Sequence, residues 1–311
     1  MSSNLLSIVI PSQHRADLLR ICLTTVQQYK PSGTQVIVVD DGSPGGVVSR
    51  VAGEFTGVEV VRNERSGGFA VAANRGIAAA RGVVIELLND DTQVTPGWAD
   101  AALAACADPT VGAVAPLVLQ GPPSLARRAN GSRPLARRAS EGIPLIDSAG
   151  DEYDRGGFAR KRGHGERMSA AYREPSEVFG ASASSAFYRA DVLRTVGGFP
   201  EHFGAYFEDV DLAWRIRRAG YRAVYEPRSV VWHRVGSSYR PRRALLERQS
   251  QNEERVFWRN VPGVWRLLPR HAAVLMGKAL RRVREGTLVP WTIGRLRAFA
   301  EVPGMVRGRA E

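Results

Sequence analysis

The feature that most constrains the fold is a regular alternation of short apolar runs and helical stretches over residues 1–120. The apolar runs are rich in Val and Ile and short enough to be buried strands. They are Ser7–Ile10, Val36–Val39, Val58–Val61, Val83–Leu88 and Val111–Ala115. A chain that alternates strand and helix in this way favours a doubly wound, mainly parallel sheet. The predicted fold class is therefore α/β.

The remainder of the chain divides into three segments. Residues 121–175 are rich in Gly, Pro, Ser and Arg, which predicts a long, variable excursion. Residues 176–238 return to ordered elements, and residues 239–311 are predicted to form a basic helical tail. We therefore expect one domain that ends near residue 238. The elements expected in its second half are helices at Arg189–Val196 and Glu208–Ala219 and strands at Tyr221–Tyr225 and Val230–His233.

Composition narrows the class of protein. The 311 residues carry a formal net charge of +12, and the basic residues concentrate in 121–173 and from residue 240 onward. Such segments favour nucleic acid, anionic lipid or phosphorylated substrates, although Arg in place of Lys on a solvated surface is an equal alternative. Cys22 and Cys106 sit among small or apolar neighbours, which predicts buried thiols rather than a disulfide. No secretory leader or membrane-spanning run is visible, so we expect a cytoplasmic protein.

Polar and acidic residues follow three of the predicted strands, at Pro11–Arg15, Asp40-Asp41 and Asn89-Asp90-Asp91. In doubly wound sheets, ligands bind outside the carboxyl ends of the strands. The adjacent carboxylates of Asp90 and Asp91 repel each other, and a hard divalent cation relieves this and can bridge to a diphosphate. Asp40 or Asp41 can accept hydrogen bonds from a nucleobase or a ribose. A surface turn remains the alternative for both pairs.

Three further features could contribute to a site. The glycine-rich run that contains Gly68 and Asn74 would let the backbone approach a flat ligand, but it is not a dinucleotide fingerprint. Glu208, Asp209 and Asp211 open a predicted helix, and favourable interaction with the helix dipole explains one or two of these acids but not all three. Asp209 points away from the face shared by the other two and is suited to deprotonate a hydroxyl. His233 ends a predicted strand, where a lone histidine is more often structural.

These pieces, in this order, resemble the family 2 glycosyltransferases, and most closely their bacterial rhamnosyltransferase and galactofuranosyltransferase type. The stretches that carry the resemblance run from Ser7 to Ser238. They are SIVIPSQHRADLLRICLTTV, VIVVDDGS, RNERSGGFAVAANRGI, LLNDDT, GGFPEHFGAYFEDVDLAWRIRRAGY and VVWHRVGSS. The resemblance implies a GT-A fold, in which residues 1–120 form a Rossmann-like nucleotide-sugar-binding half and 176–238 an acceptor half.

The resemblance also implies roles for individual residues. The first loop and the glycine-rich segment would line the nucleotide, Asp40 would contact the base with Asp41 beside it, and Asp90 would reach the sugar or ribose. The implied nucleotide-sugar-binding residues are Pro11, Gln13, Arg15, Asp40, Asp41, Gly68, Asn74 and Asp90. Asp91 and His233 would hold a divalent metal, Mn2+ or Mg2+. Asp209 would be the catalytic base of an inverting hexosyltransferase.

Two departures from the family pattern bear on these roles. The metal motif reads Asn-Asp-Asp, so its first acid is missing and Asp91 remains. The first loop reads Ser-Gln-His-Arg, where relatives often carry Thr-x-Asn-Arg, which leaves the donor open among UDP-, dTDP- and GDP-sugars. A glycan or a lipid-linked molecule is the expected acceptor, in the synthesis of cell-surface polysaccharide, glycolipid or another glycan.

The sequence leaves open both the role of the C-terminal tail and whether the protein turns over its substrate. The basic tail and its tryptophans indicate either peripheral docking at the inner face of the membrane or packing on the domain. A nucleotide-sugar-binding relative without turnover is the alternative to an enzyme. Nucleic acid is not an expected partner, because the acids at the strand ends would repel its phosphates unless a metal is bound.

Overall fold

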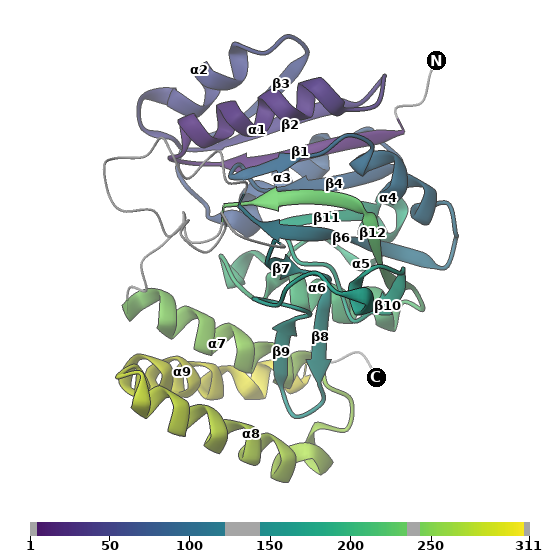
Figure 1. Cartoon of the computed structure of the whole chain (residues 1–311). Coiled ribbons are helices and arrows are strands. Elements are labelled where there is room, and N and C mark those ends of the chain that lie inside the picture. The colour runs from purple at the N-terminus through teal and green to yellow at the C-terminus, as the bar shows by residue number, and fades with distance from the viewer. Residues whose placement is uncertain (1–4, 122–143, 235–242, 308–311) are drawn as a thin grey trace.

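The computed structural model of the chain describes residues 5–121, 144–234 and 243–307, and a central sheet runs through it (Figure 1). Its strands are β1 (Leu6–Ser12), β2 (Gln35–Asp41), β3 (Val58–Asn63), β4 (Val84–Leu88), β5 (Thr92–Val94), β6 (Val111–Gln120), β7 (Ile146–Ser148), β10 (Ser176–Val178), β11 (Ser185–Arg189) and β12 (Arg222–His233). β8 (Asp151–Asp154) and β9 (Phe158–Lys161) form a separate hairpin. The helices are α1 (Ala16–Tyr29), α2 (Val47–Gly53), α3 (Phe69–Ala79), α4 (Trp98–Cys106), α5 (Ala190–Val196), α6 (Glu208–Arg218), α7 (Arg243–Asn260), α8 (Val264–Arg284) and α9 (Leu288–Arg307).

The strand order places the polar strand ends together. The sheet runs β10-β12-β6-β11-β4-β1-β2-β3, with β5 on β12 and β7 on β6. β1 pairs in parallel with β2 and β4, so their carboxyl ends meet at one edge. β11 enters antiparallel between β4 and β6, and β12 runs parallel to β6. The predicted α/β, doubly wound, mainly parallel sheet is confirmed.

The sheet is covered on both faces because its strands are apolar on both sides. Along β1, Ile8 and Ile10 join one core with α1, α2 and α4, whereas Val9 joins the other with α3, α5 and α6. Strands buried on both faces read as continuous apolar runs rather than as alternations, which is the pattern seen in the sequence. Cys22 and Cys106 are buried and unbonded to each other, as expected.

Two regions differ from the sequence expectation. The two short strands expected at 221–225 and 230–233 form one strand, β12, with a change of register between Glu226 and Val230. Glu226 accepts hydrogen bonds from the backbone and side chain of Arg228, which holds this irregularity in place. Of the predicted excursion at 121–175, residues 122–143 lie outside the described residues. Residues 146–161 contribute β7, β8 and β9, so this part is built into the domain.

The C-terminal helices are joined to one another through a buried acid, Glu254, and His271 extends these contacts to the rest of the molecule. Glu254 on α7 is fully buried and accepts hydrogen bonds from Trp258, Arg295 and His271. Nδ1 of His271 lies 2.7 Å from the carbonyl oxygen of Gly156, in the turn of the β8–β9 hairpin. In Figure 1, α7 lies beside that hairpin and α8 lies below it. Within the described part of the chain, none of the helices has the length and apolar character needed to span a bilayer.

Candidate active site

The acid pair Asp90 and Asp91 follows β4 and is buried. Arg15, in the loop after β1, forms ion pairs with both carboxylates, and its contact to Asp91 Oδ2 is 2.5 Å. Ser12, the last residue of β1, donates a hydrogen bond to Asp90 Oδ2 at 2.6 Å. Burial raises the pKa of Asp90 to about 6, although the charge of Arg15 opposes this rise. The parallel pairing of β1 and β4 therefore brings the first loop onto the acids, and Arg15 lies on them in this structure.

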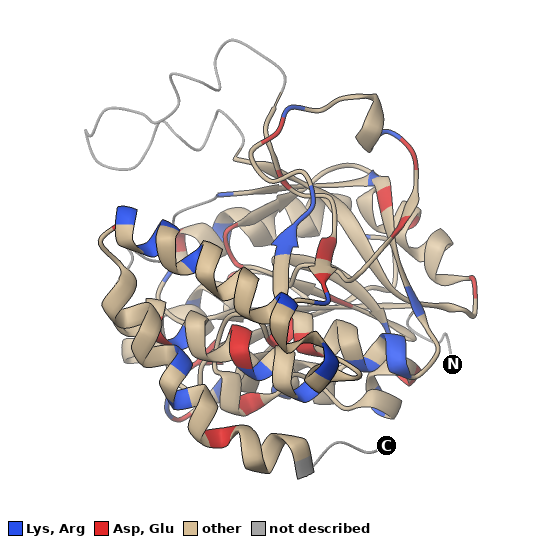
Figure 2. Ribbon diagram, turned by 90° about the horizontal axis from the view of Figure 1, so that it is seen from below, with Lys and Arg blue, Asp and Glu red and all other residues tan. Residues whose placement is uncertain are grey.

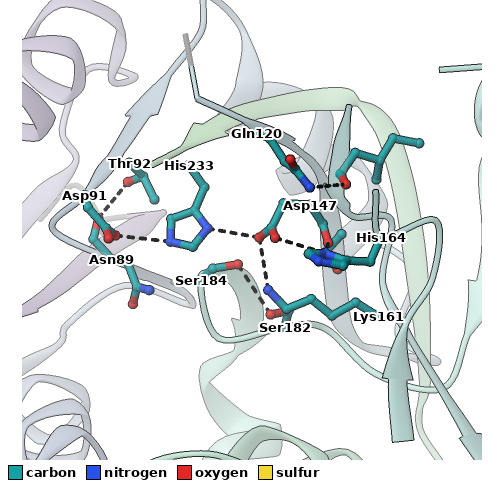
Figure 3. A network of polar contacts seen from close by, with 12 residues as sticks. Asn89, Asp91, Thr92, Gln120, Asp147, Lys161, His164, Ser182, Ser184 and His233 are labelled. Atoms are coloured by element: carbon teal, nitrogen blue, oxygen red, sulfur yellow. Dashed lines mark hydrogen bonds and ion pairs between the residues drawn. The ribbon is translucent and has the colours of Figure 1, made fainter. Parts of the chain in front are cut away.

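His233, the last residue of β12, lies between Asp91 and a third acid, Asp147 (Figure 3). Its Nε2 is 3.2 Å from Asp91 Oδ1, and its Nδ1 is 2.9 Å from Asp147 Oδ2. Burial lowers the pKa of His233, but the hydrogen bonds to Asp147 and Asp91 outweigh it and raise the pKa to about 9. The antiparallel pairing of His233 with Thr92 of β5 places the histidine beside the acid pair.

Asp147 is a site residue that the sequence analysis missed. It lies on β7, is nearly fully buried, and accepts a hydrogen bond from Lys161 Nζ at 3.0 Å. His164 Nδ1 lies 3.3 Å from its Oδ1. Burial raises the pKa of Asp147, but these contacts and His233 more than offset that effect and hold the pKa far below its usual range. The segment before β7 gave no periodic signal; the only clue was an acid after the short apolar run Leu145-Ile146.

The side chains around Asp91 and His233 supply part of the ligand set of a divalent cation. Among the described residues, no set of three or more His, Cys, Asp or Glu side chains is arranged to hold a metal. Asp91 Oδ1 and His233 Nε2 are 3.2 Å apart, close to the separation of about 3 Å expected for two neighbouring ligands of one small cation. Asp147 contacts Nδ1, so Nε2, which faces Asp91 here, is the ring nitrogen that could bind a metal, an arrangement typical of metal-binding histidines. The protein thus offers two ligands, and further oxygens would come from a bound diphosphate and water.

Asp209 lies in the first turn of α6 and is half-buried. Its Oδ2 accepts a hydrogen bond from the backbone nitrogen of Ala183 at 3.0 Å, and its Oδ1 accepts one from Val210 at 2.9 Å. Burial raises the pKa of Asp209, and the bond from Ala183 offsets this only in part. Burial and the charge of Asp209 raise the pKa of nearby Asp151 to about 8. A raised pKa makes a carboxylate a better base near neutral pH.

The other two acids of this helix turn are more deeply buried than Asp209. Asp211 is fully buried and bonds to Arg215 on its own helix and to Arg259 and Asn260 on α7. Glu208 is buried, and burial raises its pKa well above the usual value. Asp209 is therefore the most exposed of the three acids, which agrees with the orientation that the helical spacing predicted.

Segment 182–184 connects Asp209 with the acid pair. The backbone nitrogen of Ala183 donates to Asp209, and the carbonyl oxygen of Ser184 accepts from the backbone nitrogen of Asn89 at 3.0 Å. Asn89 directly precedes Asp90 and Asp91. The proposed base and the proposed metal ligands therefore border the same short segment.

The loop before Asp209 is conformationally strained and is held by the C-terminal helices. Tyr206 and Phe207 have φ values of 72° and 67°, in the left-handed region that side chains other than glycine rarely adopt. Asn252 on α7 is fully buried, and its Nδ2 lies 2.9 to 3.1 Å from the carbonyl oxygens of Phe203, Ala205 and Tyr206. Asn252 is thus a positioning residue that lies far outside the motifs.

Replacing Asn252 by alanine is expected to leave these carbonyls without a donor, at a cost of about 1–3 kcal/mol in the free energy of unfolding. Because the loop leads into α6, kcat should fall as well, while donor KM changes little. Denaturant unfolding and steady-state kinetics measure the two effects. Gln251→Ala is the control, since this neighbour bonds Glu301 and not the loop. Equal stability and kcat for the two variants would rule out the positioning role.

The nucleotide-side residues are held mainly by contacts within the chain. Asp40 accepts hydrogen bonds from Ser43 and Ser49 and pairs with Arg62. Asp41 accepts hydrogen bonds from Asn63, Ser66 and the backbone nitrogens of Gly67 and Gly68, at 2.7 to 3.0 Å. Pro11 is buried in β1, and Gln13 is partly exposed in the loop after it.

Gly68 and Asn74 bring the nucleotide half against the acceptor half. Gly68 has a φ of 85° directly before α3, and a Cβ there would lie 3.5 Å from the Gly204 carbonyl oxygen. The amide of Asn74 exchanges two hydrogen bonds with the backbone of Phe199, at 2.7 and 2.9 Å. In this structure the Asn74 side chain therefore fixes the loop before α6, and its predicted role at the nucleotide remains a prediction.

Comparison with known families identifies the chain. The model of Glycosyl transferase family 2 matches residues 7–197, more than half of the chain. The protein belongs to glycosyl transferase family 2. A second model, Glycosyl transferase family group 2, matches residues 157–293. The family predicted from the motifs is thereby confirmed.

Two named relatives of this family 2 member come from Mycobacterium tuberculosis. The pre-mycofactocin glycosyltransferase is 32% identical over 230 residues, which cover 73% of this chain and 42% of the relative. The chain thus spans less than half the length of that relative. N-acetylglucosaminyl-diphospho-decaprenol L-rhamnosyltransferase is 31% identical over 222 residues, which cover 65% of this chain and 67% of the relative.

Solved structures with the same fold support the GT-A assignment. GalNAc-T7 with UDP, GalNAc and Mn2+ has a TM-score of 0.64 at 17% identity and covers 85% of this chain and 49% of its own. The mannosyltransferase PcManGT from Pyrobaculum calidifontis, with GDP-Man and Mn2+, has a TM-score of 0.56 at 19% identity. That match covers 96% of this chain and 87% of the other. The expected GT-A fold is confirmed.

Proposed function

We propose that this protein is a metal-dependent, inverting glycosyltransferase that moves a sugar from a nucleotide-sugar donor onto an acceptor hydroxyl. The observation that carries the proposal is that the proposed base and the acid pair both lie next to one short segment, residues 182–184. Asp209 bonds to Ala183 on one side, and Asn89, which precedes the acid pair, bonds to Ser184 on the other. A base and an anion-stabilising centre are the two groups that such a transfer requires.

The donor in this proposal carries a diphosphate. Asp91 and His233 would hold Mn2+ or Mg2+, which when bound supplies Lewis-acid stabilisation of the charge that develops on the diphosphate leaving group. The neighbours with the same fold contain Mn2+ together with UDP or GDP-Man, which supports a UDP-, dTDP- or GDP-sugar here. Asp40, Asp41 and the first loop are proposed to position the nucleotide.

Asp209 performs the proton transfer in this proposal. Its carboxylate accepts the proton of the acceptor hydroxyl while that oxygen forms a bond to the anomeric carbon of the donor. The bond from the anomeric carbon to the diphosphate oxygen breaks in the same displacement, so the anomeric configuration inverts. The transition state has oxocarbenium character, as in glycoside chemistry generally.

The acceptor class is proposed from a relative. The decaprenol rhamnosyltransferase bears a name that includes a lipid diphosphate, which favours a lipid-linked or glycan acceptor for this chain. This places the reaction in the synthesis of cell-surface polysaccharide, glycolipid or another glycan. The basic C-terminal segment is proposed to contact the membrane in which such an acceptor resides.

A ligand screen followed by a turnover assay tests the proposal. With Mn2+, one nucleotide sugar should raise the melting temperature, since a ligand at 100 times its Kd stabilises by about 2.7 kcal/mol, and EDTA should abolish the shift. With that donor and an acceptor extract, nucleoside diphosphate should be released, and NMR should show an inverted anomeric centre in the product. Donor binding without release would establish the binding-only alternative, and a retained anomeric centre would contradict the single displacement.

A further inference from the structure

Helix α8 presents apolar side chains on two opposite faces. Its inner face packs on α7, with Val264 buried and Leu267 and Leu268 against the cluster of Phe257 and Trp258. His271 continues this face and stacks on Phe257 at 3.7 Å between ring centroids. This face therefore makes most of the packing of α8 on α7, and the exposed Trp265 beside it contacts Trp258 at 5.6 Å between ring centroids.

The outer face carries an apolar stripe, Trp265, Pro269, Ala272, Met276, Leu280 and Val283, which recur every three or four residues. Large members of the stripe are strongly exposed: Trp265 61%, Met276 66%, Leu280 59% and Val283 59%. The neighbouring helix α9 adds Val289, Leu296 and Phe299, which are also exposed. The other large exposed apolar residues of the described chain, Leu5, Val60, Val83 and Phe158, lie outside these two helices. A contiguous exposed stripe of this kind marks an interaction surface.

Arginines border the apolar stripe along one side. Arg266, Arg270, Arg281 and Arg284 are exposed, and each follows a stripe residue by one position, which places it about 100° around the helix. Two acids lie against them, because Arg270 pairs with Asp154 and Arg281 with Glu285. Figure 2, which views the molecule from below, shows Lys and Arg positions spread along the helices nearest the viewer.

We propose that the outer face of α8 docks the protein on an anionic lipid bilayer, with the helix lying in the plane of the interface. A helix with apolar residues on one side and arginines beside them is the pattern of interfacial helices. The core of a protein interface is depleted of charged residues, whereas arginines border this stripe near both of its ends. Long Arg side chains can reach phosphate headgroups while Trp265, Met276 and Leu280 enter the acyl boundary.

The β8–β9 hairpin joins this face to the site. Lys278 of α8 lies 4.6 Å from the ring of Phe158, at the start of β9, and Lys161, at its end, bonds to Asp147. Three residue steps of a strand span about 10 Å. Docking through α8 would therefore hold the Asp91–His233–Asp147 network a short distance above the bilayer. This consequence rests on the proposed function, whereas the docking itself does not.

Vesicle flotation tests the apolar stripe. The full chain should bind vesicles of phosphatidylcholine with phosphatidylglycerol far better than vesicles of phosphatidylcholine alone. The double variant Met276→Glu/Leu280→Glu should lose at least tenfold in binding, because two charges replace side chains that would be buried in the acyl boundary. Val83→Glu, an equally exposed apolar residue outside these helices, should bind like the wild type. Equal binding by the double variant and the wild type would overturn the proposal.

Charge variants and a solution assay separate the remaining outcomes. Arg266→Gln/Arg284→Gln should weaken binding to the anionic vesicles by about tenfold or more and leave binding to neutral vesicles unchanged. A wild type without preference for anionic vesicles would overturn the proposal. The proposal would also be overturned if light scattering showed that the wild type is a dimer that does not bind vesicles, and that the double variant is a monomer. Nucleoside diphosphate release in solution should be unchanged in these variants. If the wild type binds vesicles but releases no nucleoside diphosphate, the result counts against the proposed function and not against docking.

Discussion

Replacing Asp209 by asparagine is expected to lower kcat for sugar transfer by about 10²- to 10⁴-fold, the usual contribution of a positioned general base. The amide keeps the hydrogen bond from Ala183 but cannot accept the acceptor proton. Donor and metal affinity should stay close to those of the wild type, because the metal ligands proposed here are on β12 and after β4. Steady-state kinetics with the donor found by the ligand screen measure the loss.

The pH dependence of the wild type should report the same group. The base acts when deprotonated, so kcat should rise with pH and level off above the pKa of Asp209. Because burial raises that pKa, the rise should lie at a higher pH than the value of about 3.9 for an exposed Asp. Asp191→Asn, which changes an exposed acid in the first turn of α5, should have wild-type kinetics. Near-wild-type transfer by Asp209→Asn would remove Asp209 from the mechanism.

The second large effect is expected on metal affinity. Asp147→Asn leaves both proposed ligands in place but weakens the acceptor that orients His233, and such changes typically cost 10- to 100-fold in metal affinity. Asp91→Asn removes a charged ligand, so its loss should exceed that of Asp147→Asn. Calorimetric titration with Mn2+ in the presence of nucleoside diphosphate measures both without relying on activity. Asp191→Asn is again the control, and equal affinity in all three variants would contradict the assignment of the site.

Much of the fold and the placement of several candidate site residues followed from local patterns. The strands of residues 1–120 could be predicted because strands buried on both faces read as apolar runs. Their carboxyl ends then placed Asp90 and Asp91 at an edge. The position of Asp209 followed from helical spacing, since Asp211 and Glu208 share the buried face. One acid, Glu86, interrupts the apolar run of β4. It is buried and accepts hydrogen bonds from Trp98 and Ser185, so the strand continues through it.

The rest depended on contacts between distant segments. Asp147 is separated from His233 by most of the second half of the chain, and only the pairing of β7 and β12 with β6 brings them together. Asn252 supports the loop before Asp209 from a helix that the sequence indicated only as a basic tail. The contact of Arg15 with the acid pair follows from the pairing of β1 with β4, and its predicted role at the nucleotide remains a prediction. No spacing rule encodes such contacts.

We propose that Asp91 and His233 hold one divalent cation against a donor diphosphate. The most direct measurement is a crystal structure grown with Mn2+ and UDP, dTDP or GDP in turn, with the ion located by its anomalous scattering. We expect one ion bonded to the Asp91 carboxylate, His233 Nε2 and diphosphate oxygens, with Asp147 still on Nδ1. An ion held with the diphosphate by neither Asp91 nor His233 would contradict it.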